Sequence, residues 1–278
     1  MSIKHCLVSP FSFLLSQTIL SCYYCVRNID VAHKEEFMSL QHLLHFPKAF
    51  PQDACRYEQK YICSLAELAQ LEIRLGALMQ PDPHAGADGT YRVRSLYFDT
   101  YDDRLCRENE DGTSPRSKWR IRCYDLRRDH IALECKVHEN DRIRKRSCLL
   151  SEREADILMH GGWLEPGPDR HPLVNRFAVL QRTELMRPAS IVDYIRRPLT
   201  FPEGNVRVTF DRSISSGSAS DDLFDADAPL RPVLSPGQEL LEVKYDTLLP
   251  GAVRDAIQMR NMQRISFSKY YLSRRYHL

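Results

Sequence analysis

Charged side chains recur at every second position in several short segments, and this alternation constrains the fold more than any other feature. Two spacings repeat, Glu-x-Lys and Arg-x-Arg. Glu-x-Lys occurs at 58/60, 134/136 and 242/244, and Arg-x-Arg occurs at 92/94, 120/122 and 142/144. Successive side chains of a β-strand point to opposite faces, so the alternation predicts strands with one charged face and one apolar face.

Strands of this kind follow one another along most of the chain. We expect nine, over residues 55–62, 91–99, 117–125, 130–138, 142–149, 189–197, 205–212, 239–246 and 265–271. Four helices are predicted at 64–79, 151–160, 173–185 and 251–262, the first two beginning at the capping boxes Ser64–Glu67 and Ser151–Glu154. Loops are expected at 81–89, 109–117 and 215–229, the last a mobile segment with little apolar content. Many strands and few helices predict an α+β fold with one large antiparallel sheet.

The charged faces allow two interpretations. In the first, they are the solvated side of an ordinary antiparallel sheet. In the second, the sheet closes and brings the charged faces together, where like charges repel unless an anion lies between them. The repeated spacings favour the second interpretation. A polyanion suits such an interior, because arginine offers forked donors to phosphate oxygens and lysine offers a compact charge. The interleaved carboxylates can hold a divalent cation.

The distribution of charge also bears on the class of partner. The net charge of +2 gives no global field that would draw the chain onto nucleic acid. Arginine and lysine instead concentrate within residues 92–146. The aromatic residues alternate onto the apolar faces, where they could not stack on bases beside the phosphates. We therefore expect no nucleic-acid partner.

The cysteines and the N-terminal segment bear on location. The nine cysteines indicate reduced thiols in a cytoplasmic protein, and the lone CxxC of Cys22 and Cys25 has no second ligand pair for zinc. Residues 6–26 are apolar but interrupted, so a weakly ordered extension and a membrane anchor both remain open. We divide the chain into an extension, 1–50, and a tunnel domain, 51–278, with Met38 as a second candidate start. The expected location is the cytoplasm, with membrane association if the segment is an anchor.

A set of short motifs occurs in order between about residues 55 and 275. They are Arg-Tyr-Glu-Gln-Lys-Tyr (56–61), Val-Arg-Ser-Leu-Tyr-Phe-Asp-Thr (93–100), Lys-Trp-Arg-Ile-Arg-Cys-Tyr (118–124), Leu-Glu-Cys-Lys (133–136), Arg-Lys-Arg-Ser (144–147), Tyr-Ile-Arg (194–196), Val-Arg-Val-Thr-Phe-Asp (206–211), Leu-Glu-Val-Lys-Tyr-Asp (241–246) and Phe-Ser-Lys-Tyr (267–270). In these motifs the chain resembles the VTC (vacuolar transporter chaperone) domain, a bacterial polyphosphate polymerase domain of the triphosphate tunnel metalloenzyme (CYTH-like) superfamily.

This resemblance implies an antiparallel β-tunnel of about eight strands with a hydrophilic basic interior, flanked by helices. The implied reaction transfers the γ-phosphate of ATP to a growing polyphosphate chain, with Mn²⁺ or Mg²⁺ as cofactor and with ATP and polyphosphate as partners. The implied site consists of catalytic Lys60, Arg120, Arg122, Lys136, Arg196 and Lys269, of phosphate-binding Arg104, Lys145, Arg207 and Lys244, and of metal-binding Glu242, with Glu58 and Glu134 as further metal candidates.

Other functions of the same tunnel remain as alternatives. A triphosphate hydrolase or another tunnel-fold nucleotide enzyme would use the same lining. Such hydrolases usually have Glu-x-Glu-x-Lys in the first strand, whereas this chain has Arg56-x-Glu58-x-Lys60, which favours the polymerase. A non-catalytic phosphate or polyphosphate sensor would lose the metal-binding carboxylate, and Glu242 is present. Nothing after residue 55 could span a bilayer, so a membrane role needs the N-terminal segment or a separate membrane protein as partner.

Overall fold

A curled antiparallel sheet is the central element of the chain that the computed structural model describes, residues 56–140, 142–259 and 262–275. Its main strands follow one another in the order β1-β10-β8-β7-β3-β4-β5-β6. They are β1 (Tyr57–Ser64), β3 (Tyr91–Asp99), β4 (Arg116–Tyr124), β5 (Ala132–Glu139), β6 (Arg142–Leu149), β7 (Arg187–Phe201), β8 (Val206–Ser218) and β10 (Gln238–Tyr245), and the short strands β2 (Gln80–Pro81) and β9 (Arg231–Pro232) pair with β7 and β8.

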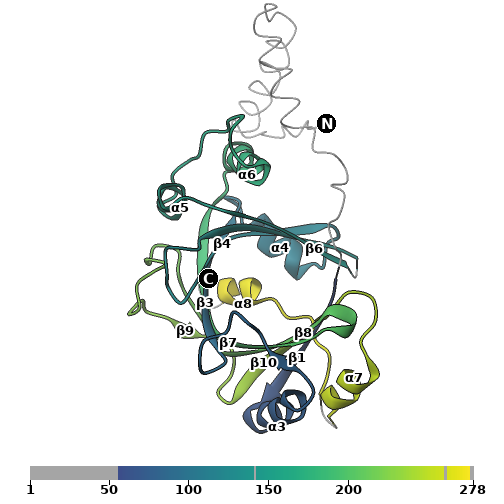
Figure 1. The fold of residues 1–278 in the computed structure, drawn as a ribbon. Helices are drawn as coiled ribbons and strands as arrows, with labels where there is room; N and C mark the ends of the chain where they lie inside the picture. Colours follow the sequence, from purple (N-terminus) through teal and green to yellow (C-terminus); the bar gives the residue numbers. More distant parts are fainter. Residues whose placement is uncertain (1–55, 141, 260–261, 276–278) are drawn as a thin grey trace, which may run out of the picture. The chain divides into compact units, whose positions relative to one another are not determined.

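The two edges of this sheet approach each other. The backbone amide of Arg56, just before β1, donates to the carbonyl of Ile143 in β6 at 3.3 Å. The sheet therefore curls into a tunnel, and Figure 1 looks along it. The α+β class and the antiparallel tunnel are confirmed. The expectations for the extension over 1–50, for Cys22 and Cys25 and for Met38 lie outside the described residues.

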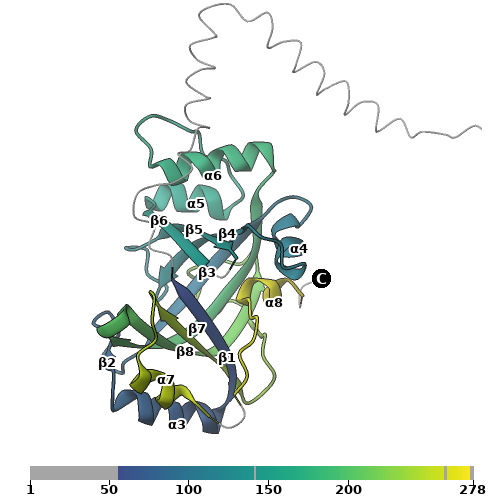
Figure 2. The ribbon, with the colours of Figure 1, turned by 90° about the vertical axis from the view of Figure 1, so that its right-hand side faces the viewer.

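The described helices are α3 (Leu65–Gly76), α4 (Arg104–Glu110), α5 (Glu152–Met159), α6 (Pro172–Thr183), α7 (Gly251–Ile257) and α8 (Lys269–Arg275), with one 3₁₀ turn, η1 (Glu203–Asn205). Figure 1 shows α8 between the two halves of the sheet. Figure 2 shows α5 and α6 on one side of the sheet and α3 and α7 on the opposite side. Across the described ranges, no helix combines the length and the apolar character needed to cross a membrane.

Two hydrophobic cores lie between the outer helices and the outer faces of the sheet. Trp119 and Ile121 of β4 pack against Phe177 of α6, and all three are at most 1% exposed. On the opposite side, Val208 of β8 belongs to a second cluster with Leu71 of α3. Full burial of one such side chain contributes ~1.5–3 kcal/mol. On β4, β5, β8 and β10 the apolar face is used outside, so their charged face is left for the interior. A third buried cluster lies inside the tunnel, where Tyr97 of β3 and Tyr194 of β7 pack with Tyr270 of α8.

The capping boxes that the sequence predicts are both present. The Ser64 hydroxyl accepts from the amide of Glu67 at 3.3 Å, and the Glu67 carboxylate accepts from the amide of Ser64 at 2.8 Å. Ser151 and Glu154 form the same pair at the start of α5. These side chains satisfy amides that have no partner inside the helix, which explains why both helices begin where the sequence predicts.

The expected strand over 265–271 is wrong. A backbone bond from the Ile265 amide to the Lys60 carbonyl, at 2.9 Å, continues the strand-like pattern, but α8 begins at Lys269. The Ser268 hydroxyl accepts from the amide of Tyr271 at 3.2 Å, as an N-terminal helix cap does. Alternation of Ile265 and Phe267 mimics a strand over the three residues before this cap.

Two loop predictions also fail in part. Residues 109 and 110 belong to the unpredicted helix α4, whose first amides, those of Leu105 and Cys106, donate to the buried carboxylate of Asp99. This cap comes from the end of β3 rather than from the residue before the helix, so no local signal marks the start. Residues 215–218, predicted as loop, extend β8, which pairs there with β7 and β9.

Candidate active site

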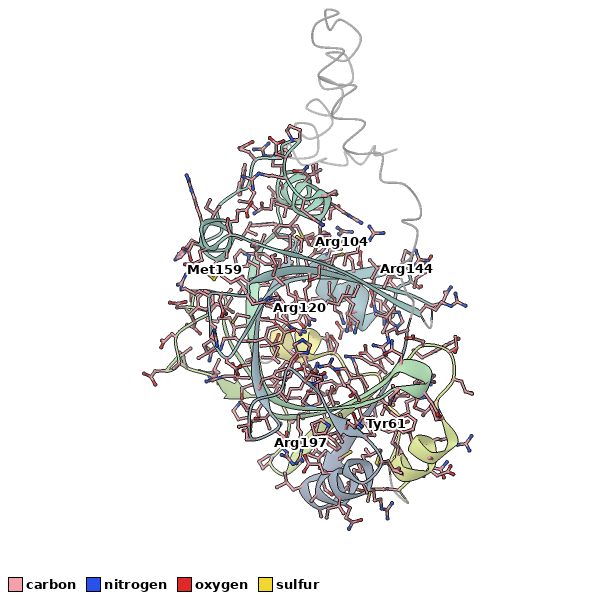
Figure 3. All side chains as sticks on the ribbon, in the orientation of Figure 1. Tyr61, Arg104, Arg120, Arg144, Met159 and Arg197 are labelled. Carbon is pink, nitrogen blue, oxygen red and sulfur yellow. The ribbon has the colours of Figure 1, made fainter. Side chains whose placement is uncertain are left out.

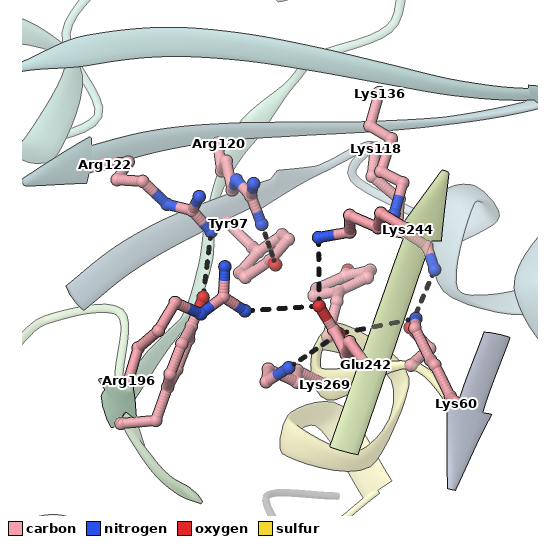
Figure 4. A pocket seen from close by; sticks show the side chains of 13 residues that line it. Lys60, Tyr97, Lys118, Arg120, Arg122, Lys136, Arg196, Glu242, Lys244 and Lys269 are labelled. Atoms are coloured by element: carbon pink, nitrogen blue, oxygen red, sulfur yellow. Dashed lines mark hydrogen bonds and ion pairs between the residues drawn. The ribbon is translucent and has the colours of Figure 1, made fainter. Parts of the chain in front are cut away.

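The tunnel interior contains a cavity of about 70 Å³, called here the inner cavity. Eight of the described side chains that line it are basic: Lys60, Lys118, Arg120, Arg122, Lys136, Arg196, Lys244 and Lys269. Among the same described lining residues, Glu242 is the one carboxylate. Figure 4 shows these groups converging from β1, β4, β5, β7, β10 and α8. Charged faces from strands far apart in the sequence therefore meet at one place.

Glu242 in β10 forms ion pairs with several of these basic groups. Its carboxylate lies 3.0 Å from Lys244 Nζ, 3.0 Å from Lys269 Nζ and 3.2 Å from the Arg196 guanidinium (Figure 4). Lys60 Nζ is more distant, at 3.9 Å. Burial alone would raise the pKa of Glu242, but these cations hold it well below its usual range. Glu242 is therefore ionised at neutral pH.

Asp211 in β8 is a second buried carboxylate that orients the same cations. It accepts from Arg196 at 2.6 and 2.7 Å and from Lys269 at 2.6 Å, and it is 0% exposed. Burial raises its pKa, but Arg196 and Lys269 lower it further, so that the pKa ends below its ordinary value. Asp211 thereby fixes where both basic side chains point, without lining the cavity itself.

Glu58 and Glu134 act as counter-ions in the same way. Glu58 lies 2.8 Å from Lys136 Nζ and 2.9 Å from Lys60 Nζ. Glu134 lies 2.6 Å from Arg120. Burial would raise the pKa of both carboxyls, but the neighbouring cations lower it well below the usual range.

These contacts bear on whether a divalent metal ion could bind in the site. The described residues hold no group of three or more His, Cys, Asp or Glu side chains that could ligate an ion. Glu58 and Glu242 share Lys60 and Lys244 as neighbours, at distances of 2.9 to 4.0 Å. Mg²⁺ in phosphate-handling sites is held by one or two carboxylates, with the other ligands from phosphate oxygens and water. Glu58 and Glu242 together supply the number of carboxylates that this mode of binding uses.

Two lysines show the excess of positive charge most clearly. Burial and the neighbouring Lys60 and Lys244 lower the pKa of Lys136 to about 8, although Glu58 opposes the shift. Lys118 has no carboxylate within ion-pair distance in the described chain, and its ammonium donates to the Ser268 hydroxyl at 2.7 Å. Burial, with Lys60 and Lys136 nearby, holds the pKa of Lys118 well below its usual range. An anion bound between these groups would relieve their repulsion.

The structure brings most of the predicted site residues together. Lys60, Arg120, Arg122, Lys136, Arg196, Lys244, Lys269 and Glu242 line the inner cavity. Lys145 contacts Glu134 at 2.5 Å with a side chain that is 46% exposed. Arg207 lies instead against Asp82 at 2.8 Å and the Tyr91 hydroxyl at 2.8 Å. Arg104 contacts Glu108 and Glu184 and does not line the cavity.

Two of the three Arg-x-Arg pairs do not contribute to the tunnel. Arg94 shares the outer face of β3 with Leu96, and its Nε donates to Asp193 at 2.7 Å. Arg142 and Arg144 alternate with Lys145 and so face away from the interior, as Figure 3 shows for Arg144 in contrast to Arg120. The spacing identifies charged strands correctly, but it does not tell which face of a strand points inward.

Sequence reasoning missed Asp211 and left Lys118 out of the site. Asp211 follows Arg207 and Thr209 at period two in Val-Arg-Val-Thr-Phe-Asp, so its face could have been inferred. Lys118 shares a face with Arg120 in the same way. Tyr97, which also lines the cavity, gives no such signal, because alternating tyrosines are typical of any half-buried strand.

Fold and site together define a tunnel protein with a basic interior. A family model, the VTC domain, matches residues 55–277, and the chain belongs to this family. Among solved structures, a candidate adenylate cyclase from Bacillus halodurans is 15% identical with a TM-score of 0.42, over 72% of this chain and 83% of that one. A candidate adenylyl cyclase from Hippeastrum with a dominant triphosphatase activity is 12% identical with a TM-score of 0.47, over 80% of this chain and 95% of that one. Comparison with curated proteins gave no significant match.

Proposed function

We propose that this protein is a polyphosphate polymerase, which transfers the γ-phosphoryl group of ATP to the end of a polyphosphate chain inside the tunnel. The observation that carries the proposal is the inner cavity, where eight basic side chains surround a single carboxylate of the described lining. Polyphosphate and the triphosphate of ATP carry the same repeating charge, so one lining can hold donor and acceptor together. Membership of the VTC domain family supports this assignment.

The reaction requires little covalent chemistry from the protein. A terminal oxygen of the acceptor chain attacks the γ-phosphorus, a new P–O bond forms, and the bond from the γ-phosphorus to its bridging oxygen breaks. The electron pair of that bond goes to the β-phosphate of the departing ADP. The acceptor oxygen is already ionised, so no general base is needed. Catalysis consists of holding the reacting atoms in line and stabilising charge.

Arginine side chains are suited to hold the transferred group. Arg120 is fixed by Glu134 on one side and donates to the Tyr97 hydroxyl at 2.7 Å on the other. Arg122 donates to the Tyr194 hydroxyl at 3.1 Å. Arg196 is fixed by Asp211. Three guanidinium groups held in place before the substrate arrives would stabilise the spread negative charge of the transition state without further rearrangement.

Lysines and carboxylates of the inner cavity complete the site. Lys60, Lys136 and Lys244 would follow the phosphate chain as point charges. Glu242, with Glu58, would hold Mn²⁺ or Mg²⁺ together with phosphate oxygens. Such an ion offsets charge on the leaving diphosphate. Lys269 would stay between Asp211 and Glu242, 2.6 and 3.0 Å away, and keep Glu242 oriented.

The start of β1 favours transfer over hydrolysis. Arg56 stands where hydrolases of this fold usually carry a glutamate. Its Nε lies 2.9 Å from Asp246, and the two side chains are 28% and 39% exposed. This position therefore supplies a neutralised ion pair at the edge of the tunnel rather than a further metal-binding carboxylate.

A second candidate function is binding of polyphosphate without turnover. The observation that favours it is that Glu58, Glu134, Asp211 and Glu242 each contact at least two basic groups. A carboxylate held in this way is less free to accept a metal. In that case the protein would bind phosphate chains as a sensor.

Product analysis of the full-length chain distinguishes these functions. The protein is incubated with ATP and Mn²⁺ or Mg²⁺, and the products are separated by gel electrophoresis and identified by ³¹P NMR. Long phosphate chains together with ADP support the polymerase. Free phosphate released from triphosphate supports a hydrolase and overturns the proposal. Tight binding of polyphosphate without turnover supports the sensor.

A further inference from the structure

A second cavity of about 330 Å³ adjoins the inner cavity and is called here the mouth cavity. It lies between β1, β4, β5 and the segment before α8. Lys60, Lys118, Lys136 and Ser268 line both cavities, so the two share one wall. The residues found in the mouth cavity and absent from the inner one include Arg116, His138 and Arg264.

The mouth cavity contains polar atoms that have no partner. Arg116 Nε and His138 Nδ1 are buried and make no hydrogen bond. The other side of the Arg116 guanidinium is anchored, because Nη1 donates to the Thr113 carbonyl at 2.9 Å. A buried donor without an acceptor destabilises a protein by about 1–3 kcal/mol, so such atoms mark a place where a ligand would be favoured.

Charge in the mouth cavity is strongly one-sided. Glu58 is the one carboxylate among the described lining residues, and Lys60 and Lys136 already contact it. Arg116 and Lys118 have no ion-pair partner in the described chain. Burial first, and then the nearby Arg116, Lys136 and Lys118, lower the pKa of His138 to about 4. A ligand that fits is therefore an anion with acceptor oxygens.

Nothing in the described lining suits a nucleoside. Apart from the imidazole of His138, Phe267 is the one ring among the described residues of the mouth cavity, and it is only 8% exposed. The mouth cavity has donors for phosphate oxygens but no exposed ring on which a base could stack.

We propose that the mouth cavity binds the acceptor phosphate chain, through Arg116, Lys118 and His138, and so makes affinity increase with chain length. This inference rests on the proposed function, because it assigns the two cavities to two parts of one phosphate-transfer site. Phosphates of ATP or of a short chain fill the inner cavity. A longer chain continues past Lys118, which both cavities share, and reaches the unpartnered Arg116 Nε.

The test compares a short and a long ligand on the full-length protein without ATP. Dissociation constants for tripolyphosphate and for a long polyphosphate chain are measured by calorimetry at fixed ionic strength. For Arg116→Ala we expect affinity for the long chain to fall about tenfold, the value of one charged hydrogen bond. Affinity for tripolyphosphate should fall by less than about threefold, because the inner cavity is intact. Arg142→Ala, on the outer face of β6, is the matched control and should affect neither.

The melting temperature of each variant without ligand checks the fold. Removal of Arg116 relieves repulsion in the mouth cavity, so its melting temperature should be unchanged or higher. If Arg116→Ala does fail to fold, His138→Ala tests the position that pairs with Arg116 on the neighbouring strand β5, and it should weaken binding of the long chain more than binding of tripolyphosphate. Equal losses for both ligands, no loss for either, or an equal effect of Arg142→Ala would overturn the inference.

Polymer synthesis from ATP is measured on the same samples. If no polymer forms but Arg116→Ala still discriminates by chain length, the polymerase proposal fails and the mouth cavity remains a chain-binding site. If polymer forms but Arg116→Ala weakens both ligands equally, the polymerase stands and the mouth-cavity assignment fails.

Discussion

Asp211→Asn is expected to destabilise the ligand-free protein by an amount that can be worked from its contacts. The substitution removes the charge that Arg196 contacts at 2.6 Å and that Lys269 contacts at 2.6 Å. Both cations are at most 8% exposed. Breaking a buried ion pair by removing one partner costs about 3–5 kcal/mol. Because Glu242 still lies 3.2 Å from Arg196 and 3.0 Å from Lys269, we expect the lower end, about 3 kcal/mol.

The assay is thermal unfolding followed by circular dichroism. For a domain of this size 1 kcal/mol corresponds to roughly 2–4 °C, so the melting temperature should fall by about 6–12 °C. Asp246→Asn is the matched control, because it makes the same chemical change at an ion pair that is 28% and 39% exposed. Such surface pairs contribute about 0–1 kcal/mol, and the control should melt within about 4 °C of the wild type.

The melting temperature with a bound ligand gives a second test of the Asp211→Asn variant. Tripolyphosphate supplies negative charge beside Arg196 and Lys269, so it should narrow the difference in melting temperature between Asp211→Asn and the wild type. If Asp211→Asn loses no more stability than Asp246→Asn, then Asp211 does not hold these two side chains, and the account of the site given above is wrong.

Three further predictions concern charge in the tunnel. Arg120→Ala or Arg122→Ala should abolish polymer synthesis while the domain still folds, and Arg142→Ala should keep activity; a folded Arg120→Ala protein with full activity would refute the mechanism. The pKa of Lys136 is about 8 when folded and about 10.5 when unfolded, so the unfolded chain binds more protons between these values. Stability of the ligand-free protein should therefore rise over this pH window while tripolyphosphate binds more weakly. Lys136→Arg, which does not titrate there, should reduce both trends, and the part that remains comes from other buried lysines whose pKa is also lowered, such as Lys118. Tripolyphosphate at about a hundred times its dissociation constant should stabilise the wild type by about 2.7 kcal/mol, or roughly 5–11 °C, and an unchanged melting temperature would contradict anion binding in the tunnel.

The sequence predicts the sheet well because the alternation of charged and apolar residues directly determines which side chains share a strand face. Eight of the expected strands are present, and Lys60, Arg120 and Glu242 meet at one cavity as expected. Both capping boxes lie within four residues of the helix start, and local signals of this kind can be read without the fold.

The errors occur where distant segments decide the structure. The start of α4 depends on Asp99 at the end of β3, and Lys269, the first residue of α8, contacts Asp211 and Glu242 on distant strands. Arg94 has the same spacing as Arg122, yet it faces outward. Which face of a strand turns inward is set by where the helices pack, and the spacing within one strand does not contain that information.

Apolar side chains fill only part of the bore of this tunnel, where Tyr97 and Tyr194 pack with Tyr270 of α8 in a third buried cluster. Elsewhere its opposite walls touch through polar contacts such as Lys136 of β5 with Glu58 of β1, and Lys118 of β4 with Ser268. In that part, the width of the bore depends on charge as well as on close packing. Ionic strength and a bound polyanion act on these contacts directly, whereas the two outer cores remain as they are. The protein can thus adjust its interior to a charged guest while its outer layers keep their shape.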